Sequence, residues 1–549
     1  MSAAVASVVA TGVLTPLAGA EAVGSSILQG TVMRAVTGGA DVPATSARVI
    51  AYPMILDDSL TSTRGASANV DGLGHFSLSV EPGDYRLRFE PLDRTLPNAL
   101  TWLGGMAYRS GSPIVHASTT GKSGLDATLP VASSISGNIT YSPDVNHTWR
   151  YTSIEAFLID PDTGTIEPQS WYGQDGYDPE GRYTIGQMPA GRYLLRFGDN
   201  ASFHAEYAPT YWPGVDSIAQ SDRVTVPSAT ALDHYDATMN PGGLYTSRLS
   251  GTDRYATVAA ISKAGYAPGV PVVYVASGEN FPDALSAGPA AAYEGGAVVL
   301  VSPTSIPAAV AAELQRLEPK RIVIMGGYAA VSAGVEAQLA SYSPTVDRIS
   351  GADRFVVSRA AARAAFTDGS DVAYLATGRN YPDALAASAA AGGDGAPVIL
   401  VDGLSTTLDR DTAQLLADLG VRRVFIAGGG SVVSVGIGRD VVSVPGVEEV
   451  KRLAGSDRYQ TAVTTGVESF PVADTAFLAT GTGFADALAG AALAGELGAP
   501  LFLVSGGCLS NQVAEAILAL DVSNVVVLGG TAVVSEPVAQ LQTCEPLPL

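Results

Sequence analysis

The second half of the chain carries three motifs that recur together, in the same order, three times. The first reads Arg-(Leu/Ile)-(Ser/Ala)-Gly-x-Asp-Arg-aromatic, the second joins Ala-(Ser/Thr)-Gly to Asp-Ala-Leu, and the third is Gly-Gly followed by Val-Ser. The first motif begins at Arg248, Arg348 and Arg452, a period of about 100 residues, which suits a small domain and is too long for a solenoid unit. The chain is therefore expected to fold into three similar domains that present one surface three times, which favours binding.

Each of these copies alternates short apolar runs with Ala-rich amphipathic stretches. Residues 272–276, 297–301 and 321–325 are continuous apolar runs, as expected for strands covered on both faces of a parallel sheet. Residues 307–317 carry Leu and Val at helical spacing, and residues 250–253 offer a capping hydroxyl or carboxylate before a helix over residues 254–264. The alternation predicts three-layer, Rossmann-like α/β domains with right-handed crossovers.

Two charged positions recur in the motifs and are the candidate site residues. The Asp of the second motif falls where a strand ends and a helix begins, so it serves either as a structural turn residue or as a ligand contact near free amides. The second Arg of the first motif either pairs with that Asp, grips a polyanion, or joins neighbouring repeats around a threefold axis. The six residues are Arg254, Asp283, Arg354, Asp383, Arg458 and Asp486.

The first half of the chain contains a different, twofold repeat. Residues 74–89 and 181–197 both alternate apolar and polar side chains around a Pro-Gly or Pro-Ala-Gly turn, which predicts hairpins of small antiparallel β-sandwiches. Trp212, with Tyr207 and Tyr211, is either a platform for sugar rings or part of a buried edge.

Both halves resemble known families. The threefold motifs, matching over about 248–535, resemble cell wall binding repeat 2, found as tandem triplets in exported proteins of Gram-positive bacteria. That resemblance implies Rossmann-like domains in a pseudo-threefold arrangement that attach to an anionic cell-wall polymer. The third copy departs from the pattern at Thr482, Gly483 and Ala485, which puts its share of a polymer site in doubt. The twofold pattern is similar to the carboxypeptidase regulatory-like domain, a transthyretin-like and starch-binding-like sandwich.

Charge and composition limit the partners. Acidic residues outnumber basic ones in the 549-residue chain to give a net charge of −22, which disfavours nucleic acid and anionic membrane surfaces. Residues 1–22 read as a secretory signal peptide whose basic start is missing, and no later run has the length of a membrane span. In an exported protein Cys508 and Cys544 would form a disulfide; the alternative is two unrelated buried thiols.

These observations predict a secreted, cell-wall-anchored surface protein in which the sandwiches form a stalk or contact polysaccharide. The expected units are 27–131 and 132–240 (sandwiches) and 246–345, 346–447 and 450–549 (binding repeats). We expect no cofactor, no metal and no enzyme activity, because the five histidines all lie in the first half, without a metal or triad pattern, and no segment of barrel size remains. The alternatives are a carbohydrate-active enzyme, amylase-like or a wall hydrolase, or its non-catalytic accessory protein, and a small-molecule binder at the strand ends.

Overall fold

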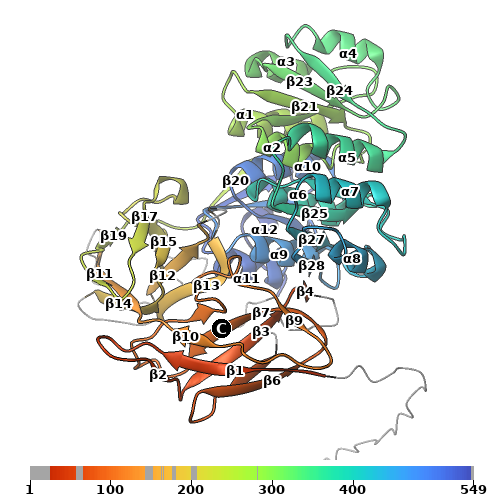
Figure 1. The fold of residues 1–549 in the computed structure, drawn as a ribbon. Helices are drawn as coiled ribbons and strands as arrows, with labels where there is room; N and C mark the ends of the chain where they lie inside the picture. Colours follow the sequence, from red (N-terminus) through yellow and green to blue (C-terminus); the bar gives the residue numbers. More distant parts are fainter. Residues whose placement is uncertain are drawn as a thin grey trace, which may run out of the picture.

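The computed structural model contains two β-sandwiches followed by three α/β units (Figure 1). It describes residues 25–56, 66–142, 152–161, 164, 166–175, 181–199, 207–240, 242–280 and 282–545. The predicted signal peptide at 1–22 lies outside these residues. Within the described part of the chain, no helix is long and apolar enough to cross a membrane.

Each sandwich packs two sheets around its own apolar core. In the first, β1 joins β2, β6 and β10 in one sheet, and β5, β3, β7, β8 and β9 form the other. The second repeats this plan with β14, β11, β18 and β19 facing β13, β12, β15, β16 and β17. The strand bounds are β1 Ser26–Arg34, β2 Val42–Pro43, β3 Ala47–Pro53, β5 Ser67–Asn69, β6 His75–Val80, β7 Gly83–Pro91, β8 Thr101–Trp102, β9 Val115–Ala117, β10 Ala127–Leu129, β11 Ser133–Tyr141, β12 Thr152–Ile159, β13 Ile166–Asp175, β14 Arg182–Met188, β15 Gly191–Asp199, β16 Thr210–Tyr211, β17 Arg223–Val226, β18 Ala231–Leu232 and β19 Ala237–Met239.

The predicted hairpins are wrong, although the strands that form them are present. β6 pairs with β1 and β7 pairs with β3, so the Pro-Gly turn crosses from one sheet to the other. Tyr85 donates its hydroxyl hydrogen to the Glu81 carbonyl across this turn, and Tyr193 does the same to Pro189 in the second sandwich. Alternation puts one face of each strand into a core, and two facing sheets meet that requirement as well as a hairpin does.

The three α/β units are built on parallel sheets. Their strand orders are β22-β21-β23-β24, β26-β25-β27-β28 and β30-β29-β31-β20. The predicted runs at 297–301 and 321–325 coincide with β22 and β23. The bounds are β20 Tyr245–Leu249, β21 Val272–Ser277, β22 Ala297–Val301, β23 Arg321–Met325, β24 Val346–Ile349, β25 Val372–Thr377, β26 Val398–Val401, β27 Arg423–Ala427, β28 Glu449–Leu453, β29 Thr475–Thr480, β30 Leu501–Val504 and β31 Asn524–Leu528.

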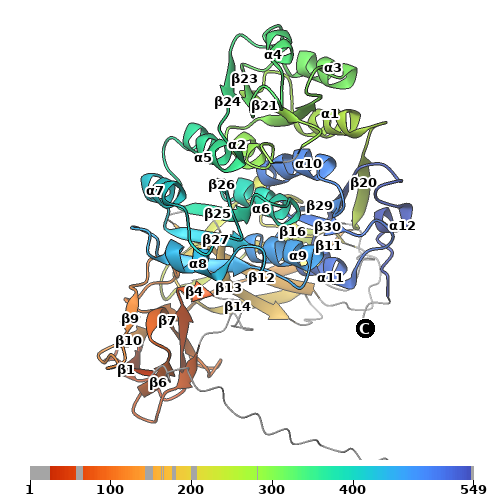
Figure 2. The same cartoon turned by 90° about the vertical axis from the view of Figure 1, so that its right-hand side faces the viewer.

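Helices cover both faces of these sheets, and three equivalent helices meet between the units. The small side chains of α2, α6 and α10 allow all three to pack against one another, and a Cβ placed on Gly392 would lie 2.8 Å from Gly495 Cα. α1, α5 and α9 each pack against the central helix of the preceding unit (Figure 2). The helix bounds are η1 Ile218–Gln220, α1 Arg254–Gly265, α2 Ala287–Tyr293, α3 Ala308–Leu317, α4 Ala333–Leu339, α5 Arg354–Ala365, α6 Pro382–Gly393, α7 Arg410–Asp418, α8 Val435–Val442, α9 Arg458–Ser469, α10 Ala485–Glu496, α11 Asn511–Ala519 and α12 Glu536–Ala539.

The units also exchange strands. The strand that opens the second repeat, β24, pairs with β23 of the first, and β28 pairs with β27 in the same way. β20, which opens the first repeat, pairs with β31 of the third. The sheets therefore do not follow the sequence repeats, because each sheet is completed by the first motif of another copy.

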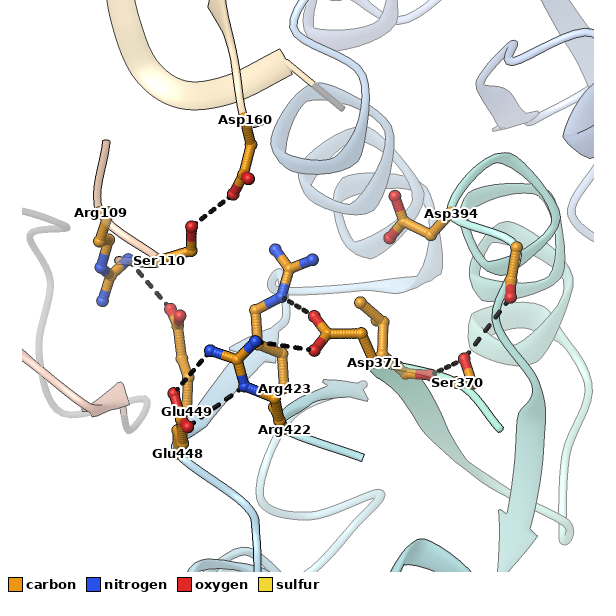
Figure 3. A network of polar contacts seen from close by, with 12 residues as sticks. Arg109, Ser110, Asp160, Ser370, Asp371, Asp394, Arg422, Arg423, Glu448 and Glu449 are labelled. Atoms are coloured by element: carbon orange, nitrogen blue, oxygen red, sulfur yellow. Dashed lines mark hydrogen bonds and ion pairs between the residues drawn. The ribbon is translucent and has the colours of Figure 1, made fainter. Parts of the chain in front are cut away.

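Each sandwich attaches to one α/β unit. The short strand β4 (Ile55–Leu56) of the first sandwich extends the second unit's sheet beside β28, and ion pairs surround this joint (Figure 3). They link Arg86 to Glu448 at 2.8 Å, Arg109 to Glu449 at 3.0 Å and Arg422 to both Glu448 and Asp371. The second sandwich attaches to the third unit, where Phe157, Ile159, Leu194 and Tyr211 cluster with Val472.

Candidate functional site

The first Arg of each repeat holds the Gly-Gly loop of the repeat whose sheet it completes. Arg348 donates to the carbonyls of Gly326 and Val331, at 2.8 and 2.9 Å. Arg452 makes the matching bonds to Gly428 and Val433, and Arg248 to Gly529 and Val534. The first and third motifs are thus parts of one contact between copies.

The second Arg of the first motif joins the first and second motifs within a repeat. Asp253, Asp353 and Asp457 cap helices α1, α5 and α9 with their carboxylates, which fixes the Arg that follows at the first helical position. Arg254, Arg354 and Arg458 then donate from Nη1 to Gly278, Gly378 and Gly481 at 2.6 Å. These bonds tie the start of each helix to the Gly of the second motif.

The Asp of each second motif lies against the Gly-Gly loop of its own repeat. A Cβ built on Gly326 would come within 2.3 Å of Asp283 Oδ2, and the matching distances are 2.6 Å for Gly428 and Asp383 and 2.5 Å for Gly529 and Asp486. All three glycines have φ near +100°, a conformation that L side chains rarely adopt. Glycine is therefore required at the first position of each Gly-Gly pair, both because there is no room for a Cβ and because the backbone has a positive φ.

Burial changes the acidity of these carboxyls. It raises the pKa of Asp383 and of Asp486 to about 6, and that of Asp283 in the same direction. In each case an arginine partly offsets the rise in pKa: Arg458 acts on Asp383, Arg254 on Asp486 and Arg354 on Asp283.

The predicted Arg and Asp residues do interact, but the prediction that both belong to the same repeat is wrong. The Arg that acts on each Asp belongs to the next repeat, and Arg254 closes the series by acting on Asp486 of the last. The physical reason is the packing of α1 against α10, which carries the start of the first repeat to the third. The six predicted residues are brought together as three pairs, one at each seam between copies.

Aromatic side chains complete the seams. The rings of Tyr255, Phe355 and Tyr459 lie so close to Gly278, Gly378 and Gly481 that an added Cβ would meet them within 2.7 Å. Between copies, Tyr381 lies 6.0 Å from Phe484, whose ring also lies 5.9 Å from the Arg254 guanidinium. The aromatic residue in the first repeat's second motif, Phe281, lies outside the described residues.

The departures in the third repeat leave its framework intact. The hydroxyls of Thr480 and Thr482 lie 2.9 Å apart, and α10 begins at Ala485, the position that Pro382 occupies at the start of α6. Asp486 keeps its place against Gly529. The prediction that a helix begins at the Asp of the second motif is wrong for the first repeat, where a turn containing Asp283 precedes α2.

Other candidates do not assemble into a site. His75, His116 and His234 are exposed, and each pairs with one aspartate: Asp71, Asp84 and Asp233 respectively. His147 and His204 lie outside the described residues. Among the residues the structure describes, no group of three His, Cys, Asp or Glu side chains could hold a metal ion. Cys508 and Cys544 form the disulfide expected for an exported chain.

Sequence reasoning missed the joints between the sandwiches and the α/β units. Asp474 accepts hydrogen bonds from the Ile218 amide at 2.9 Å and the Ser217 hydroxyl at 3.1 Å. The Nε atom of Arg196 lies 3.8 Å from Oδ2 of Asp521. No local pattern marks these residues, because their partners lie hundreds of positions away along the chain.

Comparison with known proteins identifies the threefold region. The family model described as "Cell wall binding domain 2 (CWB2)" matches residues 248–336, 348–437 and 452–539. The N-acetylmuramoyl-L-alanine amidase LytC of Bacillus subtilis (strain 168) is 27% identical over 292 residues, which cover 53% of this chain and 57% of the amidase. The amidase enhancer of the same organism is 30% identical over 276 residues, 48% of this chain and 37% of the enhancer. The chain therefore spans less than two thirds of either relative.

One solved structure shares the fold, and a second matches it less well. Cwp6 from Clostridium difficile covers 92% of this chain and 69% of its own, with a TM-score of 0.50 and 17% identity. Cwp8 from the same organism covers 83% of this chain and 77% of its own, with a TM-score of 0.49 and 19% identity.

Proposed function

Because residues 248–539 belong to the cell wall binding domain 2 family in three copies, we propose that this region anchors a secreted protein to an anionic cell-wall polymer. The family supports association with the cell wall; the polymer, the secretion and the residues that bind are our proposal. The observation that carries it is the recurrence of one arginine at each seam between copies.

The three seams form a pseudo-threefold set in this proposal. Each contains an arginine from one copy and, from the preceding copy, a carboxyl whose pKa burial raises. The raised pKa reflects a disfavoured carboxylate, and the guanidinium beside it supplies the local positive potential that a chain of net charge −22 otherwise lacks. Phosphate groups spaced along a polymer would meet these guanidiniums through charge-assisted, bidentate hydrogen bonds.

Sedimentation of the full chain with purified Gram-positive walls tests this proposal. We expect retention on intact walls, loss of retention on walls stripped of anionic polymer, and weakening at high salt. Replacing Arg254, Arg354 and Arg458 together by Gln is expected to release the chain. Arg363→Gln, an exposed arginine on α5, is the matched control and is expected to leave retention unchanged. Equal binding to stripped walls would rule out the anionic polymer.

A second candidate is an accessory of wall hydrolysis. It is favoured by the two relatives, an amidase and an amidase enhancer, which match about half of this chain. We propose that the chain itself is not a hydrolase and that its sandwiches display or contact polysaccharide. Release of free amino groups or reducing sugar from peptidoglycan by the purified chain alone would contradict the first part.

A further inference from the structure

The second sandwich carries a polar hollow on the sheet that faces away from the α/β units. The sheet of β12, β13 and β15 lies toward those units, whereas β11 and β19 lie on the outer side (Figure 1). The hollow has a volume of about 540 Å3, within the usual range for small-ligand sites. Its lining comes from both strands and from the turn after Trp212: Asn138, Thr140, Pro213, Gly214, Asp236, Ala237, Thr238 and Asn240.

The lining offers uncharged hydrogen-bonding groups and one carboxylate. The hydroxyls of Thr140 and Thr238 lie 2.9 Å apart across the two strands. Asp236 accepts the Asn138 amide hydrogen at Oδ1, at 2.8 Å, so one carboxylate oxygen is committed to the backbone. Side-chain amides and hydroxyls both donate and accept, which matches the hydroxyl groups of a sugar.

The first sandwich shows which of these residues the fold requires. In its matching strands Asp126 accepts the Thr31 amide hydrogen at 2.7 Å, as Asp236 does from Asn138. The aspartate is therefore part of the framework in both. Met33 pairs with Thr128 where Thr140 pairs with Thr238, and Pro130 stands where the second sandwich has Asn240. The polar character of the hollow is thus special to the second sandwich.

Two aromatic residues directly precede lining residues of the hollow in the sequence. Trp212 precedes Pro213 and Gly214 of the lining and packs 5.2 Å from Tyr235, which precedes Asp236. Trp212 is half-buried, whereas the matching Trp102 of the first sandwich is 2% exposed. Tyr207 and Tyr211 are buried and cannot stack on a ligand. Trp212 alone of the three aromatic residues suggested by the sequence remains accessible for stacking.

We propose that this hollow binds a neutral saccharide, through hydrogen bonds from Asn138, Thr140, Thr238 and Asn240. Among the described residues, no lysine or arginine lines it, and Asp236 repels anionic groups, so an anionic polymer is disfavoured. The site is separate from the seams of the repeats. This proposal goes beyond wall anchoring, because it assigns the second sandwich a ligand of its own. The described part of the first sandwich has no such site at the matching place.

Calorimetric titration of the full chain tests the site. The probes are maltoheptaose and chitopentaose as neutral oligosaccharides, and polyglycerol phosphate as the anionic one. We expect at least one neutral oligosaccharide to bind. Thr238→Ala is expected to weaken it about fivefold, the size of one lost hydrogen bond, and Asn138→Thr with Thr140→Met to weaken it at least about tenfold.

The first sandwich supplies the control. Thr128→Ala alters the matching exposed threonine and is expected to leave the affinity unchanged. Circular dichroism of each variant checks that it folds. Equal effects of Thr238→Ala and Thr128→Ala, or no binding of either neutral probe, would overturn the site. Binding of polyglycerol phosphate that Thr238→Ala weakens would overturn its ligand class. Wall sedimentation is expected to be unchanged in all these variants, so a failure here is distinct from a failure of the anchoring proposal.

Discussion

The two repeated regions of this molecule use repetition in opposite ways. Each sandwich closes its own core, and the apolar clusters of the two are separate. In the α/β region one apolar cluster runs through all three copies and a second lies within the third, and each copy completes a sheet of another. The motifs of the sandwiches mark internal turns, whereas those of the α/β repeats mark the contacts that join one copy to the next.

Because of this difference, an α/β motif constrains more residues than a sandwich motif does. A turn inside a sandwich needs only residues that suit its own backbone, but a seam needs complementary residues from two copies at once. Arg348, for example, has its strand partner and its carbonyl acceptors in the first repeat, although it opens the second. A damaged seam is therefore expected to weaken the whole triplet, and a damaged sandwich joint only its neighbourhood.

The largest expected effect comes from removing the disulfide, which lies in the α/β region. Replacing Cys508 and Cys544 by Ser is expected to lower the free energy of unfolding of the α/β region by about 3 to 4 kcal/mol, because the open chain gains loop entropy. Denaturant unfolding followed by hydrogen exchange measures this region by region. Because both cysteines lie in the third repeat, exchange in the first sandwich is expected to stay unchanged. An unchanged unfolding midpoint would show that the disulfide does not stabilise the three α/β repeats.

Gly326→Ala tests the fit between a Gly-Gly loop and its aspartate. The new Cβ would meet Asp283 Oδ2 at 2.3 Å and impose a side chain at a φ of +97°. We expect a loss of about 3 kcal/mol from strain and overlap together. Gly327→Ala is the control, because its Cβ would have no atom within 4 Å. Similar unfolding midpoints for the two variants would contradict the close contact described for this seam.

Asp383 gives its seam a pH dependence. The folded protein holds this proton up to pH about 6, whereas the ordinary value is 3.8. Between these values the native state binds more protons than the unfolded state, so the contribution of Asp383 to stability is fully present below pH 3.8 and is lost as the pH rises through about 6. Asp383→Asn is expected to remove this change, which amounts to about 3 kcal/mol. Asp402→Asn, an exposed residue of the same repeat whose pKa Arg379 lowers, is expected to keep it.

Much of the α/β fold could be predicted because its signals are local. The apolar runs that became β22 and β23 need burial on both faces, and the capping aspartates place the starts of α1, α5 and α9. The candidate arginines and aspartates were also found, because they recur. Their partners were not, since the seam depends on packing between α1 and α10, whose residues are far apart in the sequence.

The sandwiches show a different limit. Residues 75–80 and 83–91 have the alternation of a strand, but alternation does not say which sheet a strand enters. The joint to the second α/β unit was invisible for the same kind of reason. Arg86 is the buried partner of Glu448, and nothing near either residue indicates the other.

The smallest expected effect is at that joint. Glu448→Ala removes the carboxylate that Arg86 and Arg422 share, and because it is about one third exposed we expect a loss of about 1 kcal/mol. Hydrogen exchange is expected to quicken at Val450, whose amide donates to the Met54 carbonyl, and to stay unchanged in α2, α6 and α10. Glu536→Ala, which removes a more exposed partner of Arg248, is the control and should leave Val450 unaffected. If exchange instead quickened throughout the central helices, the first sandwich would be part of the shared core rather than a module attached to it.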